Sequence, residues 1–109
     1  MRVEVYTSPS GRQPLQEWLA ALLDARGRQR VLARIQAAAD GNLGNWRSLG
    51  SGLFEMRVFH GPGYRIYFAR EGESLVILLS GGSKGSQQRD IESARRYLAD
   101  YRERTHGAH

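Results

Sequence analysis

Apolar residues alternate with polar ones in some stretches of the chain and recur at helical spacing in others, and the two patterns predict its elements. Residues 2–7 alternate, as expected for a short strand. Pro14 suits the first turn of a helix. From there apolar side chains recur three and four positions apart, at Leu15, Trp18, Leu19, Leu22 and Leu23. An amphipathic helix is therefore predicted after an N-terminal strand.

A second amphipathic helix is expected to follow Gly27 and to end at Asp40-Gly41. Its inward positions are Val31, Leu32, Ile35 and Ala38, and its outward positions are Arg28, Arg30 and Arg34. Residues 42–52, rich in glycine and asparagine, are expected to form a loop. The side chains of Trp46 and Leu49 would attach this loop to the core.

Three strand-like runs follow in quick succession, at residues 53–60, 64–70 and 74–80. The connections between them are short and contain glycine, so the strands should form antiparallel hairpins. Ser86, or Ser83 a turn earlier, is expected to cap a last helix that runs to about residue 104. The apolar stripe of that helix is Ile91, Ala94, Leu98 and Tyr101.

The predicted order β-α-α-β-β-β-α indicates an α+β fold with a mainly antiparallel four-stranded sheet and helices packed on one face. The length of 109 residues suits a single domain, residues 1–109, with a disordered tail after about residue 104. The N-terminus lacks the apolar region of a signal peptide, and no apolar run approaches the ~18 residues of a membrane span. We therefore expect a cytoplasmic protein without a membrane partner, and the absence of cysteine fits that compartment.

The charge of the chain favours polyanionic partners. It carries 16 basic and 11 acidic residues, a formal net charge of +5, and a sequence pI near 10.2. Nucleic acid, an anionic surface or an acidic protein would each suit that excess. Lys84 is the only lysine, so it stands apart as a titratable cation among arginines.

Strand alternation predicts a polar patch on the sheet. If the apolar side chains of residues 53–60 and 64–70 face the helices, then Glu55, Arg57, Arg65 and Tyr67 share the open face. The glycine-rich segment 80–85 would then place Lys84 at the edge of that face.

Such a patch suits RNA chemistry. Arginine stays protonated, so Arg57 and Arg65 can neutralise a phosphate but cannot act as bases. RNA supplies its own nucleophile, the 2′-OH, and Lys84, Glu55, Tyr67 or His60 could transfer the protons. The alternative is structural: Glu55 and Arg57 would merely form an ion pair on the sheet.

Other chemistries lack their motifs. The segment Gly81-Gly82-Ser83-Lys84 does not have the spacing of a phosphate-binding P-loop. His60 stands alone in its strand, and His106 and His109 lie in the tail. Because no carboxylates and histidines have metal-ligand spacing, we expect neither a metal nor a small-molecule cofactor.

Two segments carry a resemblance to a known family. These are LFEMRVFHGPGYRIYF, residues 53–68, and LLSGGSK, residues 78–84, followed by QQRDI, residues 87–91. Together they closely resemble toxins of the RelE/ParE superfamily, nearest to the phage-derived, HigB-like "addiction module killer protein" group.

The resemblance implies a RelE-like fold and a toxin that a cognate antitoxin neutralises. In the RelE and HigB branches it also implies metal-independent cleavage of mRNA in the ribosomal A site. Arg65 matches the arginine that stabilises the scissile phosphate, while Arg57 and Lys84 match basic positions of the cleft. Arg89, in the second segment, is expected to contact RNA with these three.

Two positions depart from the family pattern. Gly85 stands where RelE-type sequences often place a further arginine, and Ile91 lies near the position of a catalytic tyrosine or histidine. The general acid therefore stays open. Two other functions also stay open: a ParE-like inhibitor of DNA gyrase, and a basic RNA-binding module without activity.

Overall fold

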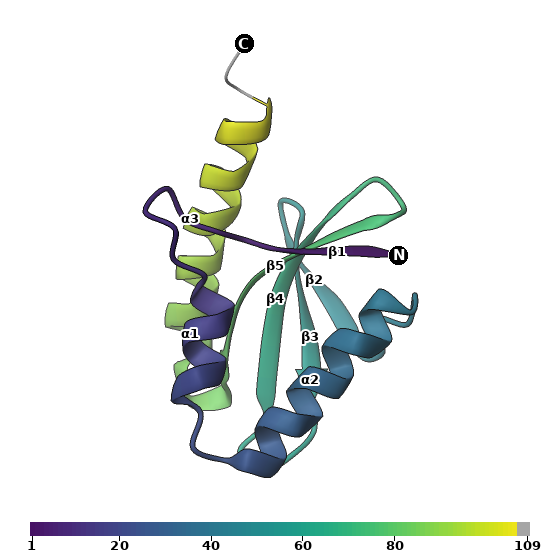
Figure 1. Ribbon diagram of the computed structural model, residues 1–109, viewed down its shortest axis with the longest axis vertical. Coiled ribbons are helices and arrows are strands. Elements are labelled where there is room, and N and C mark those ends of the chain that lie inside the picture. The colour runs from purple at the N-terminus through teal and green to yellow at the C-terminus, as the bar shows by residue number, and fades with distance from the viewer. Residues whose placement is uncertain (107–109) are drawn as a thin grey trace.

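The computed structural model describes the backbone of residues 1–106 and the side chains of residues 1–105. It has the α+β class expected from the sequence, with a five-stranded sheet and three α-helices (Figure 1). The elements are β1 (Arg2–Val5), α1 (Pro14–Ala21), α2 (Ala25–Ala39), β2 (Trp46–Gly50), β3 (Leu53–Val58), β4 (Tyr64–Glu71), β5 (Leu75–Ser83), η1 (Lys84–Ser86) and α3 (Gln87–His106). The strand order is β1-β5-β4-β3-β2, in which β1 is parallel to β5 and the other pairs are antiparallel.

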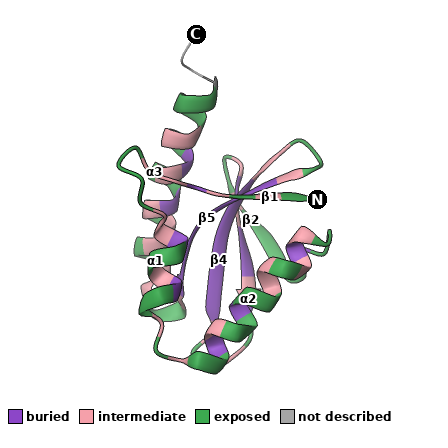
Figure 2. Ribbon diagram, in the orientation of Figure 1, coloured by how far each residue is buried: buried purple, intermediate pink, exposed green. Residues whose placement is uncertain are grey.

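Helices cover both faces of the sheet, so the expectation of helices on one face is wrong. Leu15 of α1 and Val31 of α2 belong to one buried cluster, and Ala94 and Leu98 of α3 belong to a second cluster built on the opposite strand parity. The cause lies in β4 and β5, which are buried along most of their length (Figure 2). The side chains on both faces of these two strands are apolar, so a layer of helices on one face only would leave apolar side chains of the other face in water.

The fifth strand, β2, occupies a segment expected to be a loop, and the four-strand expectation is corrected accordingly. Trp46 pairs with Met56 and Arg47 pairs with Glu55 across an antiparallel ladder with β3. Four of the five β2 residues are exposed, so this edge strand carries no apolar alternation. Trp46 nevertheless packs edge-on against Phe54, with ring centroids 5.5 Å apart, and Leu49 joins the second core cluster.

The two N-terminal helices differ from expectation at their ends. Helix α1 begins at Pro14 as predicted but ends at Ala21, which leaves Leu23 exposed. Helix α2 begins at Ala25, before Gly27, because the carboxylate of Asp24 caps it by accepting the Gly27 amide at 2.9 Å. Leu32, expected to face inward, is about half exposed.

The two glycines before Lys84 belong to β5 rather than to a loop. A Cβ at Gly81 would overlap the ring of Trp18, and a Cβ at Gly82 would overlap the carboxylate of Asp90. Only glycine lets α1 and α3 approach the end of this strand from its two sides. The strand therefore continues to Ser83, and the single turn of η1 connects it to α3.

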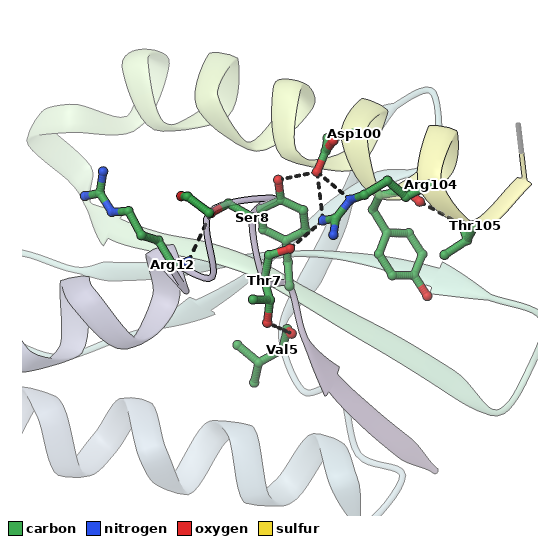
Figure 3. A network of polar contacts seen from close by, with 10 residues as sticks. Val5, Thr7, Ser8, Arg12, Asp100, Arg104 and Thr105 are labelled. Atoms are coloured by element: carbon green, nitrogen blue, oxygen red, sulfur yellow. Dashed lines mark hydrogen bonds and ion pairs between the residues drawn. The ribbon is translucent and has the colours of Figure 1, made fainter. Parts of the chain in front are cut away.

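The C-terminal half of α3 is tied to the segment after β1 (Figure 3). Asp100 accepts the Tyr6 hydroxyl at 2.7 Å and forms an ion pair with Arg104 at 2.8 Å, and Arg104 also donates to the Thr7 carbonyl. The helix reaches His106, slightly past its expected end, and the remaining tail, residues 107–109, lies outside the described residues. None of the described helices combines the length and the apolar character that a bilayer span requires.

Candidate functional site

Glu55 is a fully buried carboxylate in the middle of β3, and charged side chains from three strands gather around it. Its Oε1 accepts a hydrogen bond from Nε of Arg47 on β2 at 2.8 Å. Its Oε2 accepts a hydrogen bond from Nε2 of Gln87, the first residue of α3, at 3.2 Å. The carboxylate thus connects the edge strand, the central sheet and the last helix.

Two further arginines approach the same carboxylate oxygen. Arg57 and Arg65 are partners in the β3–β4 ladder, and their Nε atoms lie 3.5 Å and 3.7 Å from Glu55 Oε1. With Arg47, three guanidinium groups surround a single carboxylate, so the cluster keeps an excess of two positive charges. Arg65 is buried, whereas the side chain of Arg57 is 36% exposed and reaches the surface.

A pocket of about 220 Å³ opens beside this cluster. It is lined by Arg57, Val58, Phe59, Gly63, Tyr64, Arg65 and Lys84. Lys84 is fixed at the pocket because its amide donates to the Gly63 carbonyl at 3.0 Å, which joins η1 to the β3–β4 turn. The structure therefore brings together the three cations that the sequence singled out, from β3, β4 and η1. We call this cavity the arginine–lysine pocket.

The weaker candidates from the sequence lie in different surroundings. Tyr67 faces the Glu55 side of the sheet as predicted, but Tyr67 and Glu55 are both fully buried, on a face that α3 partly covers. Burial, together with the nearby carboxylates of Glu55 and Asp90, raises the pKa of the Tyr67 phenol. Arg89 lines a separate pocket at the start of α3, with Gly85, Ser86, Gln88 and Glu92.

His60 lies in the β3–β4 turn and contacts Asp24 rather than the Glu55 cluster. Its Nε2 is 3.6 Å from Asp24 Oδ2, which also accepts the Tyr64 hydroxyl at 2.7 Å. Hydrogen bonds from the Gly27 amide and from Tyr64 lower the pKa of Asp24. The contacts of Asp24 with His60, Tyr64 and Gly27 anchor the β3–β4 turn to the start of α2. Tyr64 also forms part of the wall of the arginine–lysine pocket. Among the described side chains, those of residues 1–105, no cluster of three or more carboxylates or histidines is placed to hold a metal ion.

A second basic pocket, of about 360 Å³, adjoins the first. It is lined by Arg30, Ala33, Arg34, Asn45, Arg57, Val58 and Phe59. We call it the α2 pocket; its wall shares Arg57, Val58 and Phe59 with the arginine–lysine pocket. Arg30 and Arg34 are four residues apart and so project from one side of the helix, a spacing that could have indicated a shared role. Sequence reasoning assigned a binding role to neither of them, nor to Arg47.

The arrangement suits a phosphodiester. Arg57, Arg65 and Lys84 provide positive charge from three elements of the fold, and guanidinium groups match the geometry of phosphate oxygens. Of the three, only Lys84 can exchange a proton, because arginine stays charged in proteins. Lys84 is also exposed, so a bound molecule can reach it.

Comparisons with known proteins agree with the resemblance at the level of the family. The model of the family described as "Phage derived protein Gp49-like (DUF891)" matches residues 17–101. A protein of Haemophilus influenzae described as "Uncharacterized protein" is 41% identical over 78 residues, which cover 72% of this chain and 79% of that protein. The family match extends from α1 to α3 and includes every residue of the arginine–lysine pocket. The chain thus belongs to the phage-derived Gp49-like protein family.

Proposed function

We propose that this protein is the toxin of a type II toxin–antitoxin pair and that it cleaves mRNA on the ribosome. The observation that carries the proposal is the convergence of Arg57, Arg65 and Lys84 on one pocket. Membership of the Gp49-like family supports a toxin role, since this family is associated with toxin–antitoxin systems. The ribosome and mRNA come from the resemblance to the RelE and HigB branches.

The pocket supports a metal-independent transfer in which RNA attacks itself. The 2′-oxygen of one ribose would bond to the adjacent phosphorus while the bond to the 5′-oxygen of the next nucleotide breaks. The products are a 2′,3′-cyclic phosphate and a free 5′-hydroxyl. Arg57 and Arg65 would hold the non-bridging oxygens and stabilise their added charge, at roughly 3 kcal/mol for each well-placed donor.

Proton transfer is the second requirement of this reaction. The 2′-hydroxyl must lose a proton and the leaving 5′-oxygen must gain one. Because Glu55 and Tyr67 are buried, we assign one transfer to Lys84, the exposed titratable group of the pocket. His60, in the adjoining turn, is the alternative.

A cognate antitoxin is the expected partner. The net charge of +5 and the exposed cations of both pockets favour an acidic or amphipathic segment that covers them. Co-purification with the product of an adjacent reading frame would support this pairing. Free expression of the chain alone, with normal growth, would contradict the toxin proposal.

Primer extension on cellular mRNA after brief induction tests the proposal directly. New cuts at ribosomal A sites are expected with wild type and with Arg96→Ala, a control on the exposed part of α3. Arg57→Ala should give none. Plasmid supercoiling measured in the same cells provides the second readout. Lost supercoiling without mRNA cuts would assign the toxin to DNA gyrase instead.

A further inference from the structure

Phe59 stands between the two basic pockets and is unusually exposed for an aromatic residue. It follows the last residue of β3, its exposed fraction is 69%, and it forms part of both pocket walls. An exposed phenylalanine ring forgoes the hydrophobic free energy that burial would provide. A ligand that covers the ring would recover that free energy.

The α2 pocket on one side of Phe59 is preorganised. Nη2 of Arg34 donates to the Asn42 carbonyl at 2.7 Å, and its guanidinium lies against Gly44, in the space that a Cβ would occupy. The loop itself is attached to β3, because the Arg57 amide donates to the Asn45 carbonyl at 2.9 Å. Arg34 therefore has a set position in the pocket wall, and exposed Arg30 lies one helical turn before it.

The composition of this continuous surface favours a single-stranded polynucleotide. Proteins that bind single strands combine cations along the backbone path with aromatic side chains on which bases stack. Here Arg30 and Arg34 lie on one side of Phe59, and Arg65 and Lys84 lie on the other. A partner helix would instead need a stripe of several apolar anchors, and the α2 pocket adds only Ala33 and Val58 to the ring.

We propose that the α2 pocket is a second nucleotide subsite. Phe59 stacks on the base next to the phosphate held by Arg57, Arg65 and Lys84, and Arg30 and Arg34 neutralise the following phosphate of the same strand. The identification of that strand as RNA rests on the proposed function. Stacking on a phenyl ring tolerates any base, so this subsite adds affinity and position along the strand rather than sequence preference.

Fluorescence anisotropy with a labelled hexaadenylate tests the subsite on the intact protein, outside the ribosome. Phe59→Ala should weaken binding about 5- to 150-fold, which is the range for loss of one base–aromatic stack. Phe59→Tyr keeps a ring and should bind like wild type. With an oligomer of equal length that lacks every base, Phe59→Ala and wild type should bind equally.

The cations are tested by the salt dependence of the same binding. Arg30→Ala should lower the slope of log affinity against log salt by about 0.7, the value for one phosphate contact on a single strand. Arg96→Ala removes another exposed cation, from α3, and should leave the slope unchanged. Thermal melts should be unaltered by Phe59→Ala and Arg30→Ala, because both side chains are exposed.

Several results would overturn the subsite. The first is that the wild type does not bind hexaadenylate, and the second is that Phe59→Ala binds it as tightly as the wild type does. The third is that a hexaglutamate peptide binds more tightly than hexaadenylate in a way that depends on Phe59, which would indicate a protein partner. The cellular cleavage assay separates the two proposals. If the protein cleaves mRNA but binds hexaadenylate equally well with and without the Phe59 ring, only the subsite is rejected. If RNA binding depends on Phe59 but no mRNA is cleaved, only the nuclease proposal is rejected.

Discussion

Arg57 and Arg65 lie directly opposite each other on neighbouring antiparallel strands, and both guanidinium groups face the same oxygen of Glu55. Like charges at directly opposed positions destabilise a sheet. The buried carboxylate between them offsets this repulsion and limits the directions in which the two side chains can point. A pair of cations unfavourable in an ordinary sheet is thereby held at the rim of a pocket.

Glu55→Gln should destabilise the protein and slow cleavage. The amide keeps the shape of the side chain but removes the negative charge with which Glu55 faces Arg47, Arg57 and Arg65. Removing one partner of a buried pair costs roughly 3–5 kcal/mol; solvent reaches Arg47 and Arg57, so we expect about 2–3 kcal/mol here. Urea denaturation measures this loss, with Glu17→Gln, whose exposed carboxylate pairs with Arg12, as the control. Equal unfolding midpoints for the two variants would show that Glu55 does not hold the cluster.

Arg57→Ala should slow cleavage strongly while leaving the fold nearly intact. Its side chain reaches solvent, so truncation opens no internal cavity, and loss of one donor to the transition state should slow the reaction ~10²–10³-fold. Arg65→Ala should slow cleavage comparably but also lower the melting temperature, because Arg65 is buried against Glu55. Melts and single-turnover rates on programmed ribosomes distinguish the two. If Arg57→Ala cleaves at the wild-type rate, the Arg57 side chain does not contribute to the reaction.

Lys84→Arg distinguishes a proton-transfer role from an electrostatic one. If Lys84 exchanges a proton, arginine should fail nearly as badly as alanine, with losses of ~10²–10⁴-fold, because it does not deprotonate. We expect this result, measured as single-turnover rates between about pH 6 and 9. If Lys84→Arg cleaves at nearly the wild-type rate, the role of Lys84 is only to neutralise the charge of the phosphate.

Tyr6→Phe should remove part of the alkaline instability of the protein. Burial and the hydrogen bond to Asp100 raise the pKa of Tyr6 from 10.0 to about 12. Because the folded state holds this proton more tightly than the unfolded state does, the contribution of Tyr6 is complete below pH 10 and is lost as the pH rises to about 12.

The difference between the two proteins isolates Tyr6 from the other tyrosines. Between pH 10 and 12 wild type should lose about 2–3 kcal/mol more unfolding free energy than Tyr6→Phe. At neutral pH the variant should be about 1 kcal/mol less stable, since one hydrogen bond is missing. Urea titrations at several pH values measure both effects. Parallel pH profiles would mean that the Asp100 contact does not hold the phenol proton.

Local patterns predicted the central part of this fold well. Alternation in residues 53–60 and 64–70 depends on successive side chains pointing to opposite faces, and this geometry is the same in any sheet. It was therefore enough to place Glu55, Arg57, Arg65 and Tyr67 on one face, as their contacts confirm. The Pro14 start of α1 was predicted for a similarly local reason.

Edge strand β2 and the side covered by α3 could not be predicted in this way. Trp46–Gly50 is exposed, so its membership of the sheet depends on hydrogen bonds to β3 rather than on apolar alternation. The side that α3 covers depends on the path of the chain after β5. It also depends on the need to bury apolar side chains on both faces of the sheet. Both are relations between distant segments, which a local pattern does not encode.

The sequence by itself determined the class of fold, the positive charge, and the choice of Arg57, Arg65 and Lys84 as candidates for phosphate chemistry. The tertiary structure decided which groups a ligand can reach. It buried Glu55 and Tyr67, brought Arg47 to the carboxylate, and placed Phe59 between two basic pockets. The physical reason is that residue type and strand parity are local properties. Burial and pocket shape, in contrast, arise only when β2, α2 and α3 pack around the central strands.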